Sequence, residues 1–132
     1  MQRMRSHVAG KMAVAILCGL SLVGCGASSE TEELRGLVTT SFEHNGFTPC
    51  GGRQPYWFDV SVDVPGFKML QETLAVSVTT PTTGLRSAYI EMTARKSGPG
   101  QYGHLGGYPY QVSPISIARV AAQPPPDCPV QP

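Results

Sequence analysis

The chain has 132 residues, with ten basic and nine acidic ones, a formal net charge of +1 and only 14% charged residues. That length fits one small domain with a modest core rather than two domains. Because affinity for nucleic acids comes largely from neutralising phosphates, this charge balance excludes a typical nucleic-acid-binding protein.

The first 24 residues have the pattern of an export signal. Arg3, Arg5 and Lys11 give a basic start, an apolar run of 12 residues covers 12–23, and no acidic residue precedes Cys25. A membrane-spanning helix needs about 20 apolar residues, so this run is too short for one. A basic segment followed by an apolar segment of this length is typical of a secretory signal peptide. We therefore predict that residues 1–24 are removed from the mature protein.

The end of this segment and the residue after it, Leu22-Val23-Gly24-Cys25, resemble the lipobox of bacterial lipoproteins. The resemblance implies diacylglycerol on the Cys25 sulfur and a fatty acid such as palmitate on its amino group. Two or more acyl chains hold a protein stably on a membrane. Gly26 stands where an aspartate would signal inner-membrane retention, which implies the outer membrane facing the periplasm. The alternatives are a plain secretory signal or a buried core helix.

Residues 25–132 carry seven basic and nine acidic residues, a net charge of −2. We predict a tether at 25–33, because this segment is small, polar and acidic. A β domain is expected at 34–121, followed by a proline-rich tail at 122–132.

Apolar residues alternate at period two in several segments of the domain, which favours strands. Residues 44–55 are rich in Gly and Pro and predict a loop, whereas 67–73 have the spacing of one or two helical turns. Pro114 in the last strand predicts an edge or a bulge. The fold class is therefore all-β, a small antiparallel barrel of five or six strands (OB-like) with at most one short helix; an open sandwich is the alternative. The predicted strands are 34–42, 56–64, 74–80, 88–95 and 110–120.

Two cysteines, Cys50 and Cys128, remain after Cys18 leaves with the signal peptide and Cys25 takes lipid. In an oxidising compartment the simplest expectation is one disulfide between them. The alternatives are two free thiols or an intermolecular bridge. Their wide separation lacks the close spacing of zinc ligands, so no metal and no cofactor is predicted.

The candidate binding residues are Trp57, Tyr102 and His104. His104 lies in the glycine-rich segment 100–106, where an exposed imidazole can act as a ligand contact or a general base, or can simply stabilise a tight turn. That segment lacks the Gly-Lys-Ser/Thr ending of a phosphate loop. Trp57 either lines a binding surface with Tyr102 and Tyr89 or plugs one end of the barrel. No catalytic set is predicted, because a disulfide-bonded Cys50 has no thiolate for a Cys–His nucleophile.

Two motifs occur together, Phe-x-Pro-Cys-Gly at 47–51 and Gly-x-Tyr-Gly-His-Leu-Gly at 100–106. As a pair they resemble a family of small, uncharacterised bacterial lipoproteins, over most of residues 34–120. The resemblance implies a compact β domain and no particular activity. The proline-rich tail with Cys128 departs from that family.

These observations predict a lipid-anchored periplasmic β domain that binds a partner, such as another envelope protein, or supports the envelope without catalysis. The alternative is a small ligand-binding or hydrolytic barrel that uses His104. An inhibitor of envelope-targeting hydrolases is a third hypothesis, by analogy of class alone.

Overall fold

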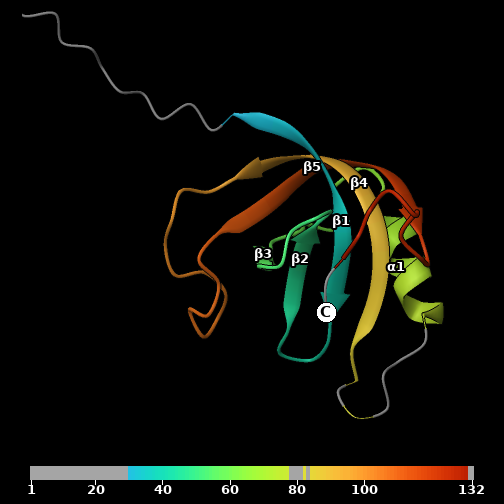
Figure 1. The fold of residues 1–132 in the computed structure, drawn as a ribbon, viewed down its shortest axis with the longest axis horizontal. Coiled ribbons are helices and arrows are strands. Elements are labelled where there is room, and N and C mark those ends of the chain that lie inside the picture. The colour runs from blue at the N-terminus through green and yellow to red at the C-terminus, as the bar shows by residue number, and fades with distance from the viewer. Residues whose placement is uncertain (1–29, 78–81, 83, 131–132) are drawn as a thin grey trace, which may run out of the picture.

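The computed structural model describes residues 30–77, 82 and 84–130. The predicted signal peptide and Cys25, the predicted lipidation site, lie outside these residues. Five strands and one helix follow one another along the chain (Figure 1). They are β1 (Thr31–Thr40), β2 (Asn45–Pro49), β3 (Tyr56–Phe58), α1 (Phe67–Val76), β4 (Arg86–Lys96) and β5 (Gln111–Ala121).

The five strands form one sheet that closes on itself in the order β1-β2-β3-β5-β4. Four neighbouring pairs are antiparallel, and β3 with β5 is parallel. The prediction of a small, OB-like all-β fold with one short helix is confirmed, with the parallel pair as the departure from a purely antiparallel sheet. The strand order, with the helix between β3 and β4, is that of an OB fold.

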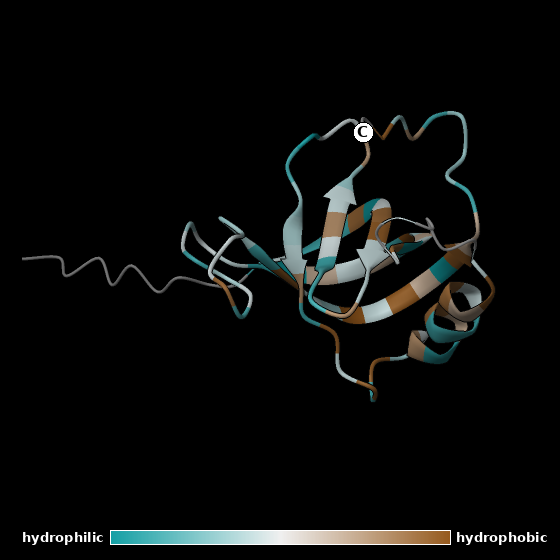
Figure 2. Cartoon of the chain, turned by 90° about the horizontal axis from the view of Figure 1, so that it is seen from below, coloured by the Kyte–Doolittle hydropathy of each residue, from teal (hydrophilic) through white to brown (hydrophobic). Residues whose placement is uncertain are grey.

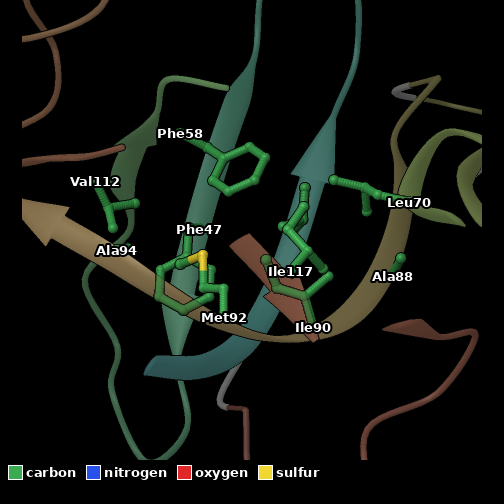
Figure 3. Packing of buried hydrophobic residues seen from close by; sticks show 10 residues of the cluster. Phe47, Phe58, Leu70, Ala88, Ile90, Met92, Ala94, Val112 and Ile117 are labelled. Atoms are coloured by element: carbon green, nitrogen blue, oxygen red, sulfur yellow. The ribbon is translucent and has the colours of Figure 1, made fainter. Parts of the chain in front are cut away.

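Side chains that alternate along the strands fill the inside of the closed sheet, and the bands of hydropathy in Figure 2 follow this alternation. The ring of Phe47 packs against Gly36 in this core. A Cβ atom at Gly36 would come within 2.9 Å of the Phe47 ring and 2.2 Å of the Thr48 carbonyl oxygen. The glycine therefore allows the ring to pack against β1. The cluster, most of it labelled in Figure 3, consists of Val38, Phe47, Phe58, Leu70, Ala88, Ile90, Met92, Ala94, Val112 and Ile117.

The helix α1 packs on this core through Leu70, which is buried, with Leu74 partly buried beside it. The helical spacing at 67–73 is thus confirmed. The strand predicted at 74–80 is wrong for Leu74–Val76, which continue α1; residues 78–80 lie outside the described part. The i, i+4 pair Leu70 and Leu74 faces the core, whereas Val76 is 82% exposed, so the local alternation did not reflect burial. Within the described residues, no helix is long and apolar enough to cross a membrane.

Two other predicted boundaries are wrong. The segment 44–55, expected to be a loop, contains β2. Asn45 pairs with Thr40 at the end of β1, and Gly46 pairs with both β1 and β3, so neither residue forms the expected turn. The strand expected at 56–64 ends at Phe58, and the chain then turns, with the Val64 amide donating to the Ser61 carbonyl.

The first strand begins earlier than predicted. Thr31 pairs with Arg95 of β4, and the Thr93 hydroxyl donates to Glu33 Oε1 over 2.6 Å. The predicted tether 25–33 is therefore wrong for residues 31–33. Their side chains are polar because this end of β1 is exposed to solvent, and the sequence pattern alone did not indicate a strand there.

The bulge predicted near Pro114 is confirmed. The pairing of β4 with β5 shifts register twice and leaves Ile115 and Ala118 without a partner on β4. As a result Val112 and Ile117 are both buried, while Ile115 is only half-buried.

The described part of the tail is held against β1 and β2. Cys50 and Cys128 form a disulfide, with Cα atoms 4.7 Å apart, as the sequence predicts. The Gly51 amide donates to the Pro129 carbonyl over 2.7 Å, and Arg35 forms an ion pair with Asp127 at 2.6 Å. This ion pair lowers the pKa of Asp127 through hydrogen bonding and charge.

Candidate functional site

Trp57 occupies the middle of β3, on the outer face of the closed sheet. Its neighbour Phe58 points into the core, so alternation along the strand turns the indole outwards. Across the sheet its backbone partners are Gly46 of β2 and Gln111 of β5. In OB folds the face of strands 2 and 3 and the loops β1–β2 and β4–β5 bind ligands. Trp57 lies on the corresponding face of this sheet.

The β4–β5 loop folds back onto the indole. Tyr102 and Tyr108 exchange two backbone hydrogen bonds of 2.8 and 3.2 Å, which bring the two sides of the loop together. Between them Gly103 has a φ of 78°, and a Cβ atom there would lie 2.9 Å from the Trp57 ring. A glycine is thus required for the loop backbone to lie against Trp57.

Three further rings lie close to Trp57, either in direct contact with it or next to a ring that contacts it. The His104 ring meets the Trp57 ring edge-on at 6.2 Å between centroids, and the Tyr108 ring lies 5.4 Å from it. His44, from the β1–β2 loop, lies 5.9 Å from Tyr108. Trp57, Tyr108, His44 and His104 are called the aromatic cluster below.

His44 ties the two loops together. One ring nitrogen, Nε2, shares a hydrogen bond of 2.8 Å with Thr39 Oγ1, and the other, Nδ1, shares one of 2.8 Å with the Tyr108 hydroxyl. Desolvation lowers the pKa of His44 and raises the pKa of Tyr108. His44 is therefore neutral at pH 7, with one nitrogen as donor and the other as acceptor.

This environment makes stability depend on pH. The pKa of His44 in the folded state lies below its ordinary value of 6.5, so protons bind the unfolded chain more readily. The contribution of His44 is complete above pH 6.5, and we expect it to be lost as the pH falls below that value towards the folded-state pKa. Urea titrations at pH 7 and pH 5.5 measure the loss.

The matched variants are His44→Gln and His104→Gln. We expect His44→Gln to reduce the difference in unfolding free energy between the two pH values. His104 is exposed and makes no hydrogen bond among the described residues, so His104→Gln should keep the wild-type difference. An unchanged difference in His44→Gln would argue against this role for His44.

The structure brings together two of the three predicted site residues, Trp57 and His104. Tyr102 is close in sequence, but its hydroxyl donates to the Gly98 carbonyl over 2.8 Å and its ring packs over Gly100. These contacts stabilise the loop. Tyr89, considered as a companion of Trp57, is fully buried and donates to Glu91.

Sequence reasoning missed His44 and Tyr108 as members of the same site. They are 64 residues apart, and both lie outside the alternating segments, so periodicity does not relate them. The glycine-rich motif at 100–106, just before Tyr108, was the only feature of the sequence near either residue that pointed to this site.

A groove of about 380 Å³ continues the cluster across the outer face of β1 and β2. Thr39 lines this groove and also bonds to His44 of the cluster. The far wall is formed by the tail, through Pro124 and Val130. The cluster and the groove thus form neighbouring parts of one surface.

A separate cavity of about 430 Å³ lies between α1 and the end of the closed sheet, lined by residues such as Phe58, Leu70 and Leu74. His104 lines neither this cavity nor the groove. The described residues contain no group of three or more His, Cys, Asp or Glu side chains that could hold a metal ion. Comparisons with protein-family models, with curated proteins and with solved structures find no match.

Proposed function

We propose that this chain is a lipid-anchored protein of the bacterial envelope, attached through Cys25, whose OB-like domain binds a ligand over the aromatic cluster without catalysis. The resemblance of its two loop motifs to small lipoproteins supports the same assignment. The single observation that carries the binding function is the contact of Trp57 with His104 and Tyr108 on the face between the two loops.

The cluster suits binding because its shape is fixed before a ligand arrives. His44 is held at both ring nitrogens, and the loop is closed by its own backbone hydrogen bonds. Preorganised side chains lose little entropy on binding, and aromatic rings offer much contact area for few rotatable bonds. The arrangement is therefore that of a recognition surface.

Hydrolysis is less well supported. A catalytic histidine needs a partner that orients its ring and a group on which it acts. His104 has only its ring contact with Trp57 among the described residues, and Cys50 is consumed in the disulfide. We therefore favour binding over the hydrolytic alternative.

The start of β1 at Thr31 supports a position close to the membrane. Only residues 26–30 separate Cys25 from the sheet, and a segment of that length reaches at most about 20 Å in any conformation. We expect intact-mass spectrometry of the exported protein to find an N-terminal Cys25 with its lipid, and Cys25→Ser to release the protein from membranes. A wild-type protein cleaved elsewhere and free of lipid would contradict the anchor.

The binding function is tested by photo-crosslinking in intact cells. Leu105, beside His104, and Val76, on α1, are 80% and 82% exposed, so a photoreactive residue at either site is equally accessible. We expect a specific adduct from position 105 that is lost with Trp57→Ala, and none from position 76. Equal labelling from both positions, or labelling at 105 that Trp57→Ala leaves unchanged, would contradict the proposal.

A further inference from the structure

We propose that the ligand is an uncharged oligosaccharide and that the groove between the outer face of β1–β2 and the tail is a second subsite for it. This inference rests on the proposed function, because it extends the site around Trp57. It follows from the continuity of the surface, its charge and the way the tail is held.

The continuity of the surface comes from Thr39. This residue lines the groove and bonds to His44, which bonds in turn to Tyr108 beside Trp57. Thr39, Gly46 and Trp57 are partners on three adjacent strands. With neighbouring strands about 4.8 Å apart, the path from Thr39 to Trp57 is roughly 10 Å. A ligand that covers the cluster and enters the groove must therefore be a chain of several units.

The groove is uncharged, with four polar residues set in a mostly apolar surface. Hydroxyl and amide groups alternate with apolar surface, which matches the hydroxyls and C–H faces of a sugar ring. Indole and phenol rings like those of the cluster add a surface on which such a face can lie. The polar residues are Thr39, Thr48, Ser87 and Gln123, and Leu37 and Pro124 are among the apolar ones.

The charges near the site disfavour anionic ligands. Glu43, next to His44, and Asp59, two residues from Trp57, are exposed carboxylates at the edges of the cluster. The cation closest to the groove in β1, Arg35, is already paired with Asp127. The two carboxylates would repel a polyanion, and Arg35 is not free to offset that repulsion because it is paired with Asp127.

The topology disfavours an extended peptide. Peptides commonly bind β domains by adding a strand to a free sheet edge. Here Trp57 lies where β3 is paired on both sides, with Gly46 of β2 and Gln111 of β5, and not at a free sheet edge. The outer face offers side chains rather than a row of unpaired backbone groups, as carbohydrate binding requires.

The tail wall is built into the fold rather than loosely placed. The disulfide, the ion pair of Arg35 with Asp127 and the Gly51–Pro129 hydrogen bond hold its last described turn beside β2. The second subsite is therefore expected to depend on the tail, whereas the ring contacts and side-chain hydrogen bonds of the aromatic cluster are made with β1, β3 and the two loops.

The test uses the full lipidated chain in detergent micelles. Trp57 is the only tryptophan, so its fluorescence reports on the cluster directly, and calorimetry reports on all variants. The probes are chitotetraose, a neutral β-linked tetramer of N-acetylglucosamine, its monomer, and tetragalacturonate as an anionic chain of equal length. Gln123→Ala alters the groove, and Gln54→Ala is the matched exposed control outside it.

We expect the tetramer to shift Trp57 fluorescence and to bind about tenfold or more tightly than the monomer, which corresponds to one or two additional hydrogen bonds. Gln123→Ala should weaken the tetramer roughly threefold or more and leave the monomer unchanged, and Gln54→Ala should do neither. Tetragalacturonate should not bind.

Equal affinities for monomer and tetramer, or an unaffected Gln123→Ala, would overturn the second subsite. Tighter binding of tetragalacturonate, or no response to any sugar, would overturn the uncharged oligosaccharide. In either case labelling from position 105 that depends on Trp57 would leave the proposed function standing, and its absence would remove both.

Discussion

Replacing both disulfide cysteines, in the double variant Cys50→Ser/Cys128→Ser, is expected to lower the free energy of unfolding by about 4 kcal/mol. The two cysteines are 78 residues apart in sequence, so the disulfide closes a long loop. In the chain-entropy model, such a cross-link lowers the conformational entropy of the unfolded chain and thereby stabilises the folded state by about 4 kcal/mol. Because native domains of this size are stable by only about 5–15 kcal/mol, the loss is a large share of the total. Urea denaturation under non-reducing conditions measures it.

The matched control is Arg35→Gln. It removes the ion pair with Asp127, which also fastens the tail but joins two exposed side chains. Solvent screens such pairs, so we expect a much smaller loss. If the double serine variant were no less stable than Arg35→Gln, the disulfide would not be the main restraint on the tail.

Gly66→Ala is expected to destabilise the domain by about 4 kcal/mol or more. Gly66 precedes α1 with a φ of 89°, and a Cβ atom there would lie 2.2 Å from the Ile117 carbonyl oxygen. Neither backbone can withdraw freely, because the Ile117 amide donates to the Pro65 carbonyl over 2.8 Å. The alanine would separate α1 from the core strand β5.

Gly51→Ala separates the two causes of this effect. Gly51 also has a positive φ, 75°, but nothing lies within 4 Å of a Cβ atom built on it. We expect only the cost of a left-handed alanine, about 1–2 kcal/mol, in the same urea titration. An equal loss of unfolding free energy in the two variants would show that the close approach of Gly66 to β5 is not the reason why a glycine is needed at that position.

Period-two alternation predicted the strands that carry most of the core. The segment 88–95 lies within β4, where Ala88, Ile90, Met92 and Ala94 are buried as the pattern requires. The alternating pattern failed in the short segment 74–76, where too few residues are available to distinguish a strand from a helix. Leu74 and Val76 alternate like a strand, yet the helical pair Leu70 and Leu74 determined the outcome.

Turn-forming residues caused the opposite error, in which a strand was predicted to be a loop. Asn45-Gly46 and Pro49 suggested a loop, but the closed sheet needs a strand between β1 and β3, and tertiary pairing overrode the local preference. The site was predicted in the same partial way. The sequence singled out Trp57 and His104, whereas His44 joins them only through contacts between residues far apart in the sequence, such as its hydrogen bond with Tyr108.

The most direct test of the central claim, that ligand binds over Trp57, follows the single indole N–H resonance in an NMR titration of the isotope-labelled full-length chain with chitotetraose. We expect chitotetraose to shift the Trp57 indole resonance most and the resonances of His44 and Tyr108 to a smaller extent, with α1 unaffected. Shifts confined to Leu70 and Leu74 around the 430 Å³ cavity, with the Trp57 resonance unmoved, would contradict it.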